Sequence, residues 1–377
     1  MKKILAITLA LITAALFVSC SGAQIQSEPT EIAPAPTETA AMTNATTEPF
    51  VPSSEPTAAP SAEPTDVPTT EPATEASTEP AHVHTFTDVI RKKPGMLEDG
   101  VMHRVCSECG EEFDEPIPAT RSIKILAFGN SFSDDGFRNL PYVLKDLGFE
   151  EVILGNLYIG SCSLDMHWDN IKSGANAYLF RETHIDGLRV DYPNKNVKYA
   201  MEKYDWDFII VQQKGNWCGD SSKFSVLGNV LSYIDQNKSN PAAKIFWHMT
   251  WSYRNGVNPS QYGGQLAFYN AIANVTKNTV MTKKLISGLI PSGTAIQNAR
   301  TSMIGDNFNH PDDGFHLGPK YGYYTAALTW ACAILKVSPG DVTWKPVGMT
   351  DDEAAAIKEA VENAIKKPYA VTKSTYN

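Results

Sequence analysis

Basic residues are absent from a long stretch near the start of this 377-residue chain. From Ser27 to Ala81 there is no lysine or arginine, but there are eleven prolines and ten acidic residues, arranged in repeated Thr-Glu-Pro and Glu-Pro-Thr units. Because such a composition cannot bury a hydrophobic core, we predict a disordered, extended linker with polyproline-II character over residues 20–81. At about 3.1 Å per residue, the linker could hold a domain up to roughly 170 Å from an anchor, which suits reaching through a cell wall.

A long hydrophobic run is also missing from the N-terminus. The apolar stretch over residues 4–18 follows two lysines and is too short to span a bilayer comfortably. Its charged start, short apolar core and small-residue exit are typical of a secretory signal, which we predict over residues 1–19. The cysteine at the exit resembles that of a bacterial lipoprotein signal, which implies lipidation of Cys20. We therefore expect an exported lipoprotein, anchored to the membrane through Cys20 on the bacterial cell surface. An ordinary signal, with Cys20 incidental, is the alternative.

A basic surface for nucleic acid is not evident either. The whole chain has a formal net charge of −10. Removing the two lysines of the signal and the ten acidic residues of the linker leaves −2 for the remainder. The folded part is thus nearly neutral, and we predict no nucleic-acid partner.

Cysteine is scarce, and two of the six cysteines lie close together in Cys106-Ser-Glu-Cys109. A Cys-x-x-Cys knuckle followed by glycine is a half-site for tetrahedral zinc, which His82, His84 or His103 could complete. The compact unit over residues 82–120 is too small to bury much surface, so a covalent or metal staple is expected. We predict structural zinc on Cys106 and Cys109, with a disulfide between them as the alternative outside the cell.

The same unit is similar to short Cys-x-x-Cys modules that are repeated in bacterial surface proteins. The similarity covers Thr85 to Ala119, including the Glu98-Asp-Gly turn and the terminal Glu-Pro-Ile-Pro segment. In those modules a cysteine often precedes the Glu-Asp-Gly turn, and Met96 occupies that region here.

Short apolar runs alternate with helical patterns from residue 121 to residue 371. This alternation predicts one α/β domain with a doubly wound, flavodoxin-like parallel sheet and helices on both faces. The expected strands cover residues 123–128, 151–158, 208–212, 243–248 and 285–290. The expected helices cover residues 139–147, 223–236, 263–278, 321–335 and 351–366.

A hydroxyl group follows the first of these strands. The apolar run ends abruptly at Gly129-Asn130-Ser131, as a buried strand does when it breaks into a tight turn. In open α/β sheets, ligands bind at the carboxyl ends of the strands, so Ser131 is placed like a nucleophile. The alternative is that Asn130, Ser131 or Ser133 merely caps the next helix.

An imidazole and a carboxylate lie far downstream, in Asn309-His-Pro-Asp-Asp-Gly-Phe-His-Leu. A serine hydroxyl is a poor nucleophile unless an imidazole takes its proton and a carboxylate orients that imidazole. Asp313 and His316 are three residues apart, so on a turn entering a helix they can share one face. We predict that Ser131, Asp313 and His316 form a catalytic triad. A turn carboxylate beside a surface histidine is the alternative.

Gly-Asn-Ser after the first strand, combined with Asp-x-x-His-Leu before a late helix, resembles the SGNH/GDSL hydrolase superfamily. The resemblance covers roughly Arg121 to Leu335, with Asn130 where aspartate is usual. Three further segments resemble a branch of it catalogued as a domain of unknown function: residues 159–164, 206–213 and 250–253. The resemblance implies a three-layer SGNH hydrolase fold and acyl-transfer chemistry without a catalytic cofactor, but no particular substrate.

The resemblance also implies donors for the oxyanion. The superfamily places a glycine after the second strand, which is Gly160 here, and an asparagine after the third strand. This chain has Gln212-Gln213 at that point and no Gly-x-Asn-Asp motif, so Gln213 or Asn216 would have to substitute. An acyl-transfer site needs two or three such donors. Capping of a strand end is the alternative role for the glutamines.

Other side chains that follow strand ends have more than one interpretation. Four aromatic residues could pack on sugar rings, although the core is the default place for each: Trp168, Trp217, Trp251 and Tyr253. Cys162 and Cys218 could pair in an exported protein and staple the loops beside the nucleophile. Cys332, in an apolar helix, fits a buried thiol.

These observations predict a cell-surface serine esterase that removes acetyl or other acyl groups from a carbohydrate. Its partner would then be an acylated carbohydrate or another small ester. Two alternatives stay open: an acyltransferase that uses the same residues, and a non-catalytic protein that binds glycan or cell wall, because a fold does not dictate a function.

Overall fold

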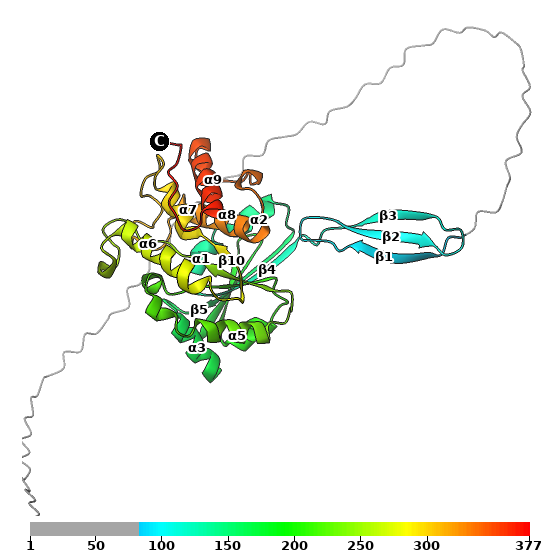
Figure 1. The fold of residues 1–377 in the computed structure, drawn as a ribbon, viewed down its shortest axis with the longest axis horizontal. Helices are drawn as coiled ribbons and strands as arrows, with labels where there is room; N and C mark the ends of the chain where they lie inside the picture. Colours follow the sequence, from blue (N-terminus) through cyan, green and yellow to red (C-terminus); the bar gives the residue numbers. More distant parts are fainter. Residues whose placement is uncertain (1–82) are drawn as a thin grey trace, which may run out of the picture. The chain divides into compact units, whose positions relative to one another are not determined.

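The computed structural model describes residues 83–377. The predicted signal, Cys20, the linker and His82 lie outside the described residues. The described chain forms a three-stranded sheet and a seven-stranded sheet, which Figure 1 shows as separate units of β-structure.

The three-stranded sheet is an antiparallel meander. Its strands β1 (Phe86–Lys92), β2 (Gly100–Cys106) and β3 (Glu112–Ile117) pair in the order β1-β2-β3. The turn between β2 and β3 is closed by the Gly110 N–H, which donates to the Cys106 carbonyl, and Gly110 has a φ of 74°. Side chains of β1 and β3 are mostly exposed, so this sheet has little core of its own.

The seven-stranded sheet confirms the predicted α/β class. Its strand order is β10-β9-β8-β4-β5-β6-β7, and the first five strands in this order are parallel. These parallel strands are β4 (Ser122–Gly129), β5 (Glu151–Tyr158), β8 (Phe208–Val211), β9 (Lys244–His248) and β10 (Ile286–Ile290). They match the five predicted strands to within two residues at each end. This is the strand order of a doubly wound sheet, in which the direction of winding reverses beside the first strand, β4.

An antiparallel hairpin that the sequence analysis did not predict extends this sheet beyond β5. It consists of β6 (Tyr178–His184) and β7 (Arg189–Lys195). Only alternate residues of β6 are buried, and β7 is largely exposed. Edge strands of this kind carry charged side chains on the solvent side and therefore give a weak apolar signal.

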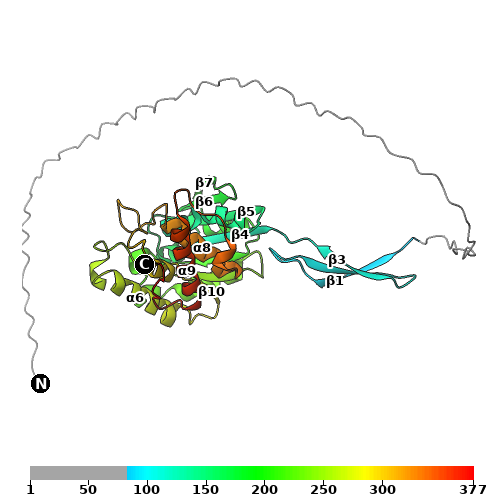
Figure 2. The same cartoon turned by 90° about the horizontal axis from the view of Figure 1, so that it is seen from above.

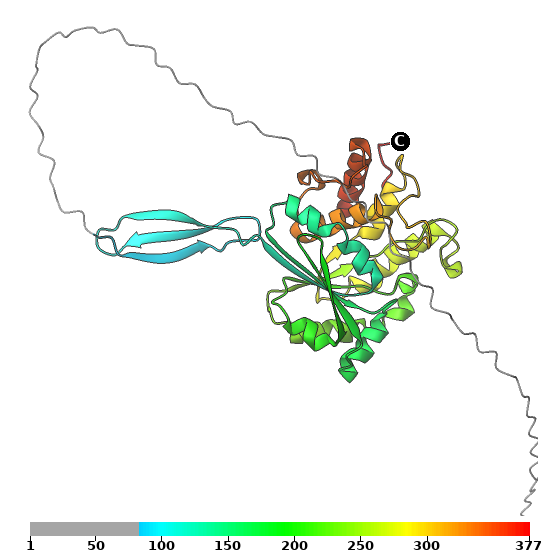
Figure 3. The ribbon, with the colours of Figure 1, turned by 180° about the vertical axis from the view of Figure 1, so that it is seen from behind.

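Helices cover both faces of the seven-stranded sheet, as predicted (Figures 1 and 3). Those on one face include α2 (Leu140–Asp146), α7 (Ser292–Ala299), α8 (Gly322–Leu335) and α9 (Asp351–Lys366). On the other face lie α3 (Leu164–Ser173) and α5 (Leu227–Asn237). Helix α8 is buried along most of its length, because it packs against α7, α9, α1 and α2.

The described residues contain further helical segments. They are α1 (Ser131–Phe137), α4 (Val197–Glu202), α6 (Gln265–Val275), a π-helical turn (Thr276–Val280) and four 3-10 turns (Gly215–Trp217, Ser221–Phe224, Ser260–Tyr262 and Pro339–Asp341). The helix predicted over residues 263–278 is thus α6 followed by the π-helical turn. Figure 2 shows α6 from above. Within residues 83–377, no helix has the length and apolar character that a membrane crossing requires.

Candidate active site

The turn after β4 places Ser131 at the carboxyl end of the sheet. Gly129 is required there, because a Cβ on it would lie 2.0 Å from the Ser133 hydroxyl oxygen. Asn130 caps α1, since its side-chain oxygen accepts from the Phe132 N–H at 2.9 Å. The capping role considered for this segment therefore belongs to Asn130, and the Ser131 hydroxyl makes a different contact.

That contact is with His316, which lies 185 residues away in the sequence. The His316 Nε2 atom is 2.7 Å from the Ser131 Oγ atom, and Nδ1 is 2.7 Å from the Asp313 Oδ2 atom. A neutral imidazole with its proton on Nδ1 donates to Asp313 and accepts from Ser131. The structure thus brings the three residues predicted as a triad into one hydrogen-bonded line.

The carboxylate of Asp313 is held by its own loop. Its Oδ1 atom accepts from the backbone N–H groups of Phe315 at 2.9 Å and His316 at 3.0 Å. Burial would raise the pKa of Asp313, but these bonds and the bond from the His316 side chain outweigh it and lower the pKa. Gly314 has a φ of 70°, which lets the loop fold back on itself. Asp313 is therefore an ionised, fixed acceptor near neutral pH.

Asp135 ties the His316 loop to the helix that begins at Ser131. The Leu317 N–H donates to its Oδ2 atom at 2.9 Å. Asp135 is only 5% exposed, and burial raises its pKa well above the usual range. Because this bond is one residue from His316 and four from Ser131, it fixes the distance between the two. The sequence analysis missed this role, although Asp135 lies only four residues after Ser131.

A buried network of uncharged groups holds the side chain of Asn130. The Gln212 Nε2 group donates to Asn130 Oδ1 at 2.8 Å, and its Oε1 atom accepts from Ser133 Oγ at 2.9 Å. His248 Nδ1 lies 3.0 Å from the same Oε1 atom. Burial lowers the pKa of His248 to about 3, so this histidine is neutral at physiological pH and donates through Nδ1. Gln212 therefore positions the turn that presents Ser131.

Gln213 does not have the predicted role of oxyanion donor. Its Oε1 atom accepts from the N–H groups of Leu164 at 3.1 Å and Lys214 at 2.8 Å, and its Nε2 group donates to the Lys223 carbonyl at 2.5 Å. Both ends of this amide are thus bound to backbone groups, and the residue is fully buried. Gln213 fastens the loops around the site.

Asn216 does lie beside Ser131. Both residues line a cavity of about 380 Å³, together with Ser161, Lys214, Tyr253 and Phe315 among others. Among the described residues, the side-chain oxygen of Asn216 is buried without a hydrogen-bond partner. Because Asn216 lines the same cavity as Ser131, its side-chain NH₂ group is a candidate donor to a substrate oxygen.

Gly160 is exposed in the loop after β5, and its neighbour Ser161 is the residue of this loop that lines the cavity. Ser161 has a φ of 56°, a conformation that residues other than glycine rarely adopt. Such strain is concentrated at functional sites. The sequence alone does not predict this positive φ angle at Ser161.

Ser131 also borders a second hollow of different character. This cavity of about 340 Å³ lies on the His316 side and is lined by charged side chains, including Asp134, Arg138 and Arg181. The Arg181 guanidinium is paired with Asp134, and Asp134 accepts from the Asn156 side chain at 2.7 Å. Ser131 thus lies between two cavities, one lined partly by aromatic rings and the other lined by charged side chains.

The aromatic and sulfur side chains near the site have distinct places. Tyr253 lines the first cavity, whereas Trp251 is fully buried and donates to the Phe315 carbonyl at 2.8 Å. Cys162 and Cys218 are both buried thiols and are not joined in a disulfide. The Cys218 Sγ atom is instead 3.0 Å from the Thr250 hydroxyl oxygen. Cys332 is buried in α8, as predicted.

The sequence matches a family described as a domain of unknown function, DUF4886, over residues 124–364. The chain belongs to this family. The predicted membership of a branch catalogued as a domain of unknown function is therefore confirmed. No curated protein matches the sequence.

Two solved structures are similar to this chain. A crystal structure of a DUF4886 family protein from Bacteroides uniformis is 35% identical, with a TM-score of 0.63, and the match covers 67% of this chain and 98% of that one. A protein from Slackia heliotrinireducens with a provisional assignment as an SGNH hydrolase is 18% identical, with a TM-score of 0.37, and the match covers 56% and 99%. The first similarity supports the family and the fold, and the second is too low to add to either.

Proposed function

We propose that this protein is a serine hydrolase of the SGNH type that cleaves ester bonds. The observation that carries the proposal is the hydrogen-bonded line from Ser131 through His316 to Asp313, in which both contacts are 2.7 Å. A general base within hydrogen-bond distance of a hydroxyl can take its proton, and a carboxylate on the other ring nitrogen stabilises the imidazolium that forms.

The reaction then proceeds in two halves. Ser131 Oγ attacks the ester carbonyl carbon while its proton moves to His316 Nε2, and His316 returns that proton to the leaving alcohol. Water then gives a proton to His316 Nε2 and attacks the carbonyl carbon of the acyl-enzyme. The bond from this carbon to Ser131 Oγ breaks, His316 returns the proton to Oγ, and the acid leaves. Ser161 and Asn216, which line the cavity beside Ser131, are the candidates for stabilising the oxygen charge that develops in both halves.

The substrate class that we propose is an acylated carbohydrate, with acetyl as the simplest acyl group. The 380 Å³ cavity is of the size that small-molecule sites have, and it combines polar side chains with the rings of Tyr253 and Phe315. Aromatic faces of this kind can pack on sugar rings. An export signal with lipidation of Cys20, as the sequence predicts, would bring the site to surface polysaccharides. Membrane fractionation of the wild type and of Cys20→Ala tests that placement.

Hydrolysis of p-nitrophenyl acetate tests the reaction. We expect turnover by the wild type and its loss in Ser131→Ala, with Ser173→Ala as the matched control, because Ser173 is exposed and bonds only to backbone carbonyls of its own helix. A screen of acetylated polysaccharides then identifies the sugar. If acetyl appears on an added sugar rather than in solution, the enzyme is an acyltransferase with the same residues. Glycan binding without turnover would contradict the enzymatic proposal.

A further inference from the structure

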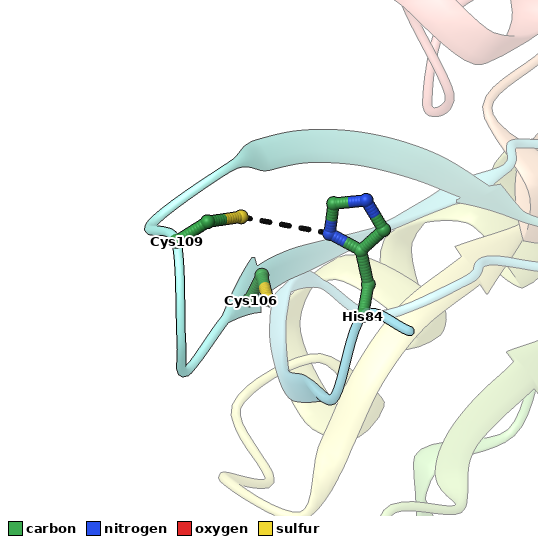
Figure 4. A group of neighbouring side chains, drawn as sticks. All are labelled: His84, Cys106 and Cys109. Carbon is green, nitrogen blue, oxygen red and sulfur yellow. Dashed lines mark hydrogen bonds between the residues drawn. The ribbon is translucent and has the colours of Figure 1, made fainter. Parts of the chain in front are cut away.

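A group of side chains that could bind a metal lies at one end of the three-stranded sheet. It includes both cysteines of the Cys-x-x-Cys knuckle. The ligand atoms of His84, Cys106 and Cys109 all lie within 4.8 Å of one another (Figure 4). The His84 Nδ1 atom is 3.5 Å from the Cys109 Sγ atom. A tetrahedral zinc ion, with bonds of about 2.3 Å to sulfur and about 2.0 Å to nitrogen, needs its ligands roughly 3.5–3.8 Å apart.

The backbone around this group is already folded as a metal knuckle. The Cys106 N–H donates to the Glu111 carbonyl at 2.8 Å, and the Gly110 N–H donates to the Cys106 carbonyl at 3.0 Å. The Ser107 N–H donates to the Thr85 carbonyl at 2.9 Å, which joins the knuckle to the residue after His84. These backbone hydrogen bonds hold both cysteines and the start of β1 together at one end of the sheet.

An acidic side chain stands behind the imidazole. The His84 Nε2 atom is 3.3 Å from the Glu111 Oε2 atom. Histidines that bind a metal through one ring nitrogen commonly donate the other N–H to a carboxylate, which fixes the tautomer and the ring orientation. Glu111 is thus placed to keep the proton on Nε2 and leave Nδ1 for a metal.

This end of the sheet also needs a cross-link. Among the hydrophobic side chains of β1, β2 and β3, Cys106 is the buried one, whereas Val89, Ile90 and Phe113 are exposed. Units of this size cannot bury enough apolar surface to be stable alone and commonly depend on a metal or a disulfide. Both Cys106 and Cys109 are thiols in the structure, so no disulfide joins them.

We propose that His84, Cys106 and Cys109 bind one zinc ion, with Glu111 as the residue that orients His84. Two sulfur ligands and an imidazole favour zinc over magnesium or calcium, which prefer oxygen ligands. The ion would link the start of β1 to the turn between β2 and β3. Its role is structural and independent of the reaction at Ser131.

Metal analysis of the full chain, purified with a thiol reductant and then dialysed against excess Zn²⁺, tests this site. We expect one zinc per chain, and with Co²⁺ in its place an absorption band for charge transfer from thiolate to cobalt. Cys109→Ser and His84→Ala should abolish stoichiometric binding. His103→Ala is the matched control in the same sheet, because the His103 Nδ1 atom is engaged by Asp114 at 2.8 Å.

Glu111→Gln keeps the ligands and should weaken the affinity for zinc by about 10- to 100-fold, as loss of a carboxylate partner does at other sites. This variant covers the case in which the ligand variants fail to fold. Absence of zinc from the wild type, or binding that is unchanged in both His84→Ala and Cys109→Ser, would overturn the proposal. A Cys106–Cys109 disulfide detected by mass spectrometry in protein exported by cells would overturn it as well.

Discussion

The seven-stranded and three-stranded sheets differ in how many of their side chains are buried. In β4, residues from Ile125 to Gly129 are all buried, whereas six of the seven residues of β1 are exposed. The large sheet can fix the turn at Ser131 through packing and buried hydrogen bonds alone. The small sheet lacks that support, and the proposed metal supplies it. If the proposed zinc binds, side chains are placed by a buried core in one region and by a metal cross-link in the other.

The largest expected effect comes from removing the base or the nucleophile in the region supported by the core. Ser131→Ala and His316→Ala should each lower kcat for ester hydrolysis by about 10⁴- to 10⁶-fold, and the double variant should be little worse, because the residues act as one unit. Steady-state kinetics with p-nitrophenyl acetate checks this. Zinc content should be unchanged in these variants, and near-normal turnover in His316→Ala would refute the triad.

Asp313→Asn should lower the plateau rate by about 10⁴-fold, because an amide does not stabilise the imidazolium and favours the wrong tautomer. In the wild type, the lowered pKa of Asp313 means that its carboxylate is lost only as the pH falls below the ordinary range near about 3.9. Protonation of Asp313 therefore does not account for activity that is lost between pH 7 and pH 5. A pH–rate profile that kept its wild-type plateau in Asp313→Asn would contradict this assignment.

Asp135 should have a smaller effect, because it positions His316 without touching the substrate. Asp135→Ala leaves the buried Leu317 N–H without its acceptor, which costs about 1–3 kcal/mol, and should lower kcat by roughly 10- to 100-fold. Asp135→Asn keeps an acceptor and should restore most of the rate. An equally inactive Asp135→Asn would show that the charge, rather than the bond, matters.

Asp135→Asn should also change the dependence of stability on pH. Since burial raises the pKa of Asp135 in the folded state, the unfolded chain ionises first as the pH rises above about 3.9, and the wild type loses stability in that window. The asparagine variant lacks this loss. Its free energy of unfolding relative to the wild type should therefore increase with pH from about 4 upward, as urea denaturation at several pH values would measure.

The smallest expected effect on catalysis comes from the three-stranded sheet. Cys109→Ser, or removal of zinc with a chelator, should change kcat/KM by less than about twofold, because Ser131 is fixed by the other sheet. A chain that begins at Arg121 should also keep activity. From the removed segment, Met96 and Leu97 pack against the large core. Removing residues before Arg121 should therefore lower the free energy of unfolding of the large domain by only about 1–2 kcal/mol. Loss of soluble protein on this truncation would show that the two regions depend on each other.

Much of the large sheet was predictable from the sequence, because buried parallel strands are continuous apolar runs. The pairing of Ser131 with His316 was predictable as well, because a serine nucleophile needs an imidazole base and the two motifs together resemble one superfamily. The hairpin of β6 and β7 was not, because exposed edge strands have no such run. The hydrogen bonds of Gln213 and the strained backbone of Ser161 depend on how loops fold around the site. The spacing of residue types in the sequence does not predict such loop conformations.

The central claim, that His316 activates Ser131 as a nucleophile, is tested most directly by covalent labelling. We expect a fluorophosphonate probe to modify the wild-type protein once, and peptide mass spectrometry to place the adduct on Ser131. Labelling should fall by orders of magnitude in His316→Ala although Ser131 is still present, and it should be unchanged in Cys109→Ser. An adduct on another residue, or equal labelling of Ser131 in His316→Ala, would contradict the account.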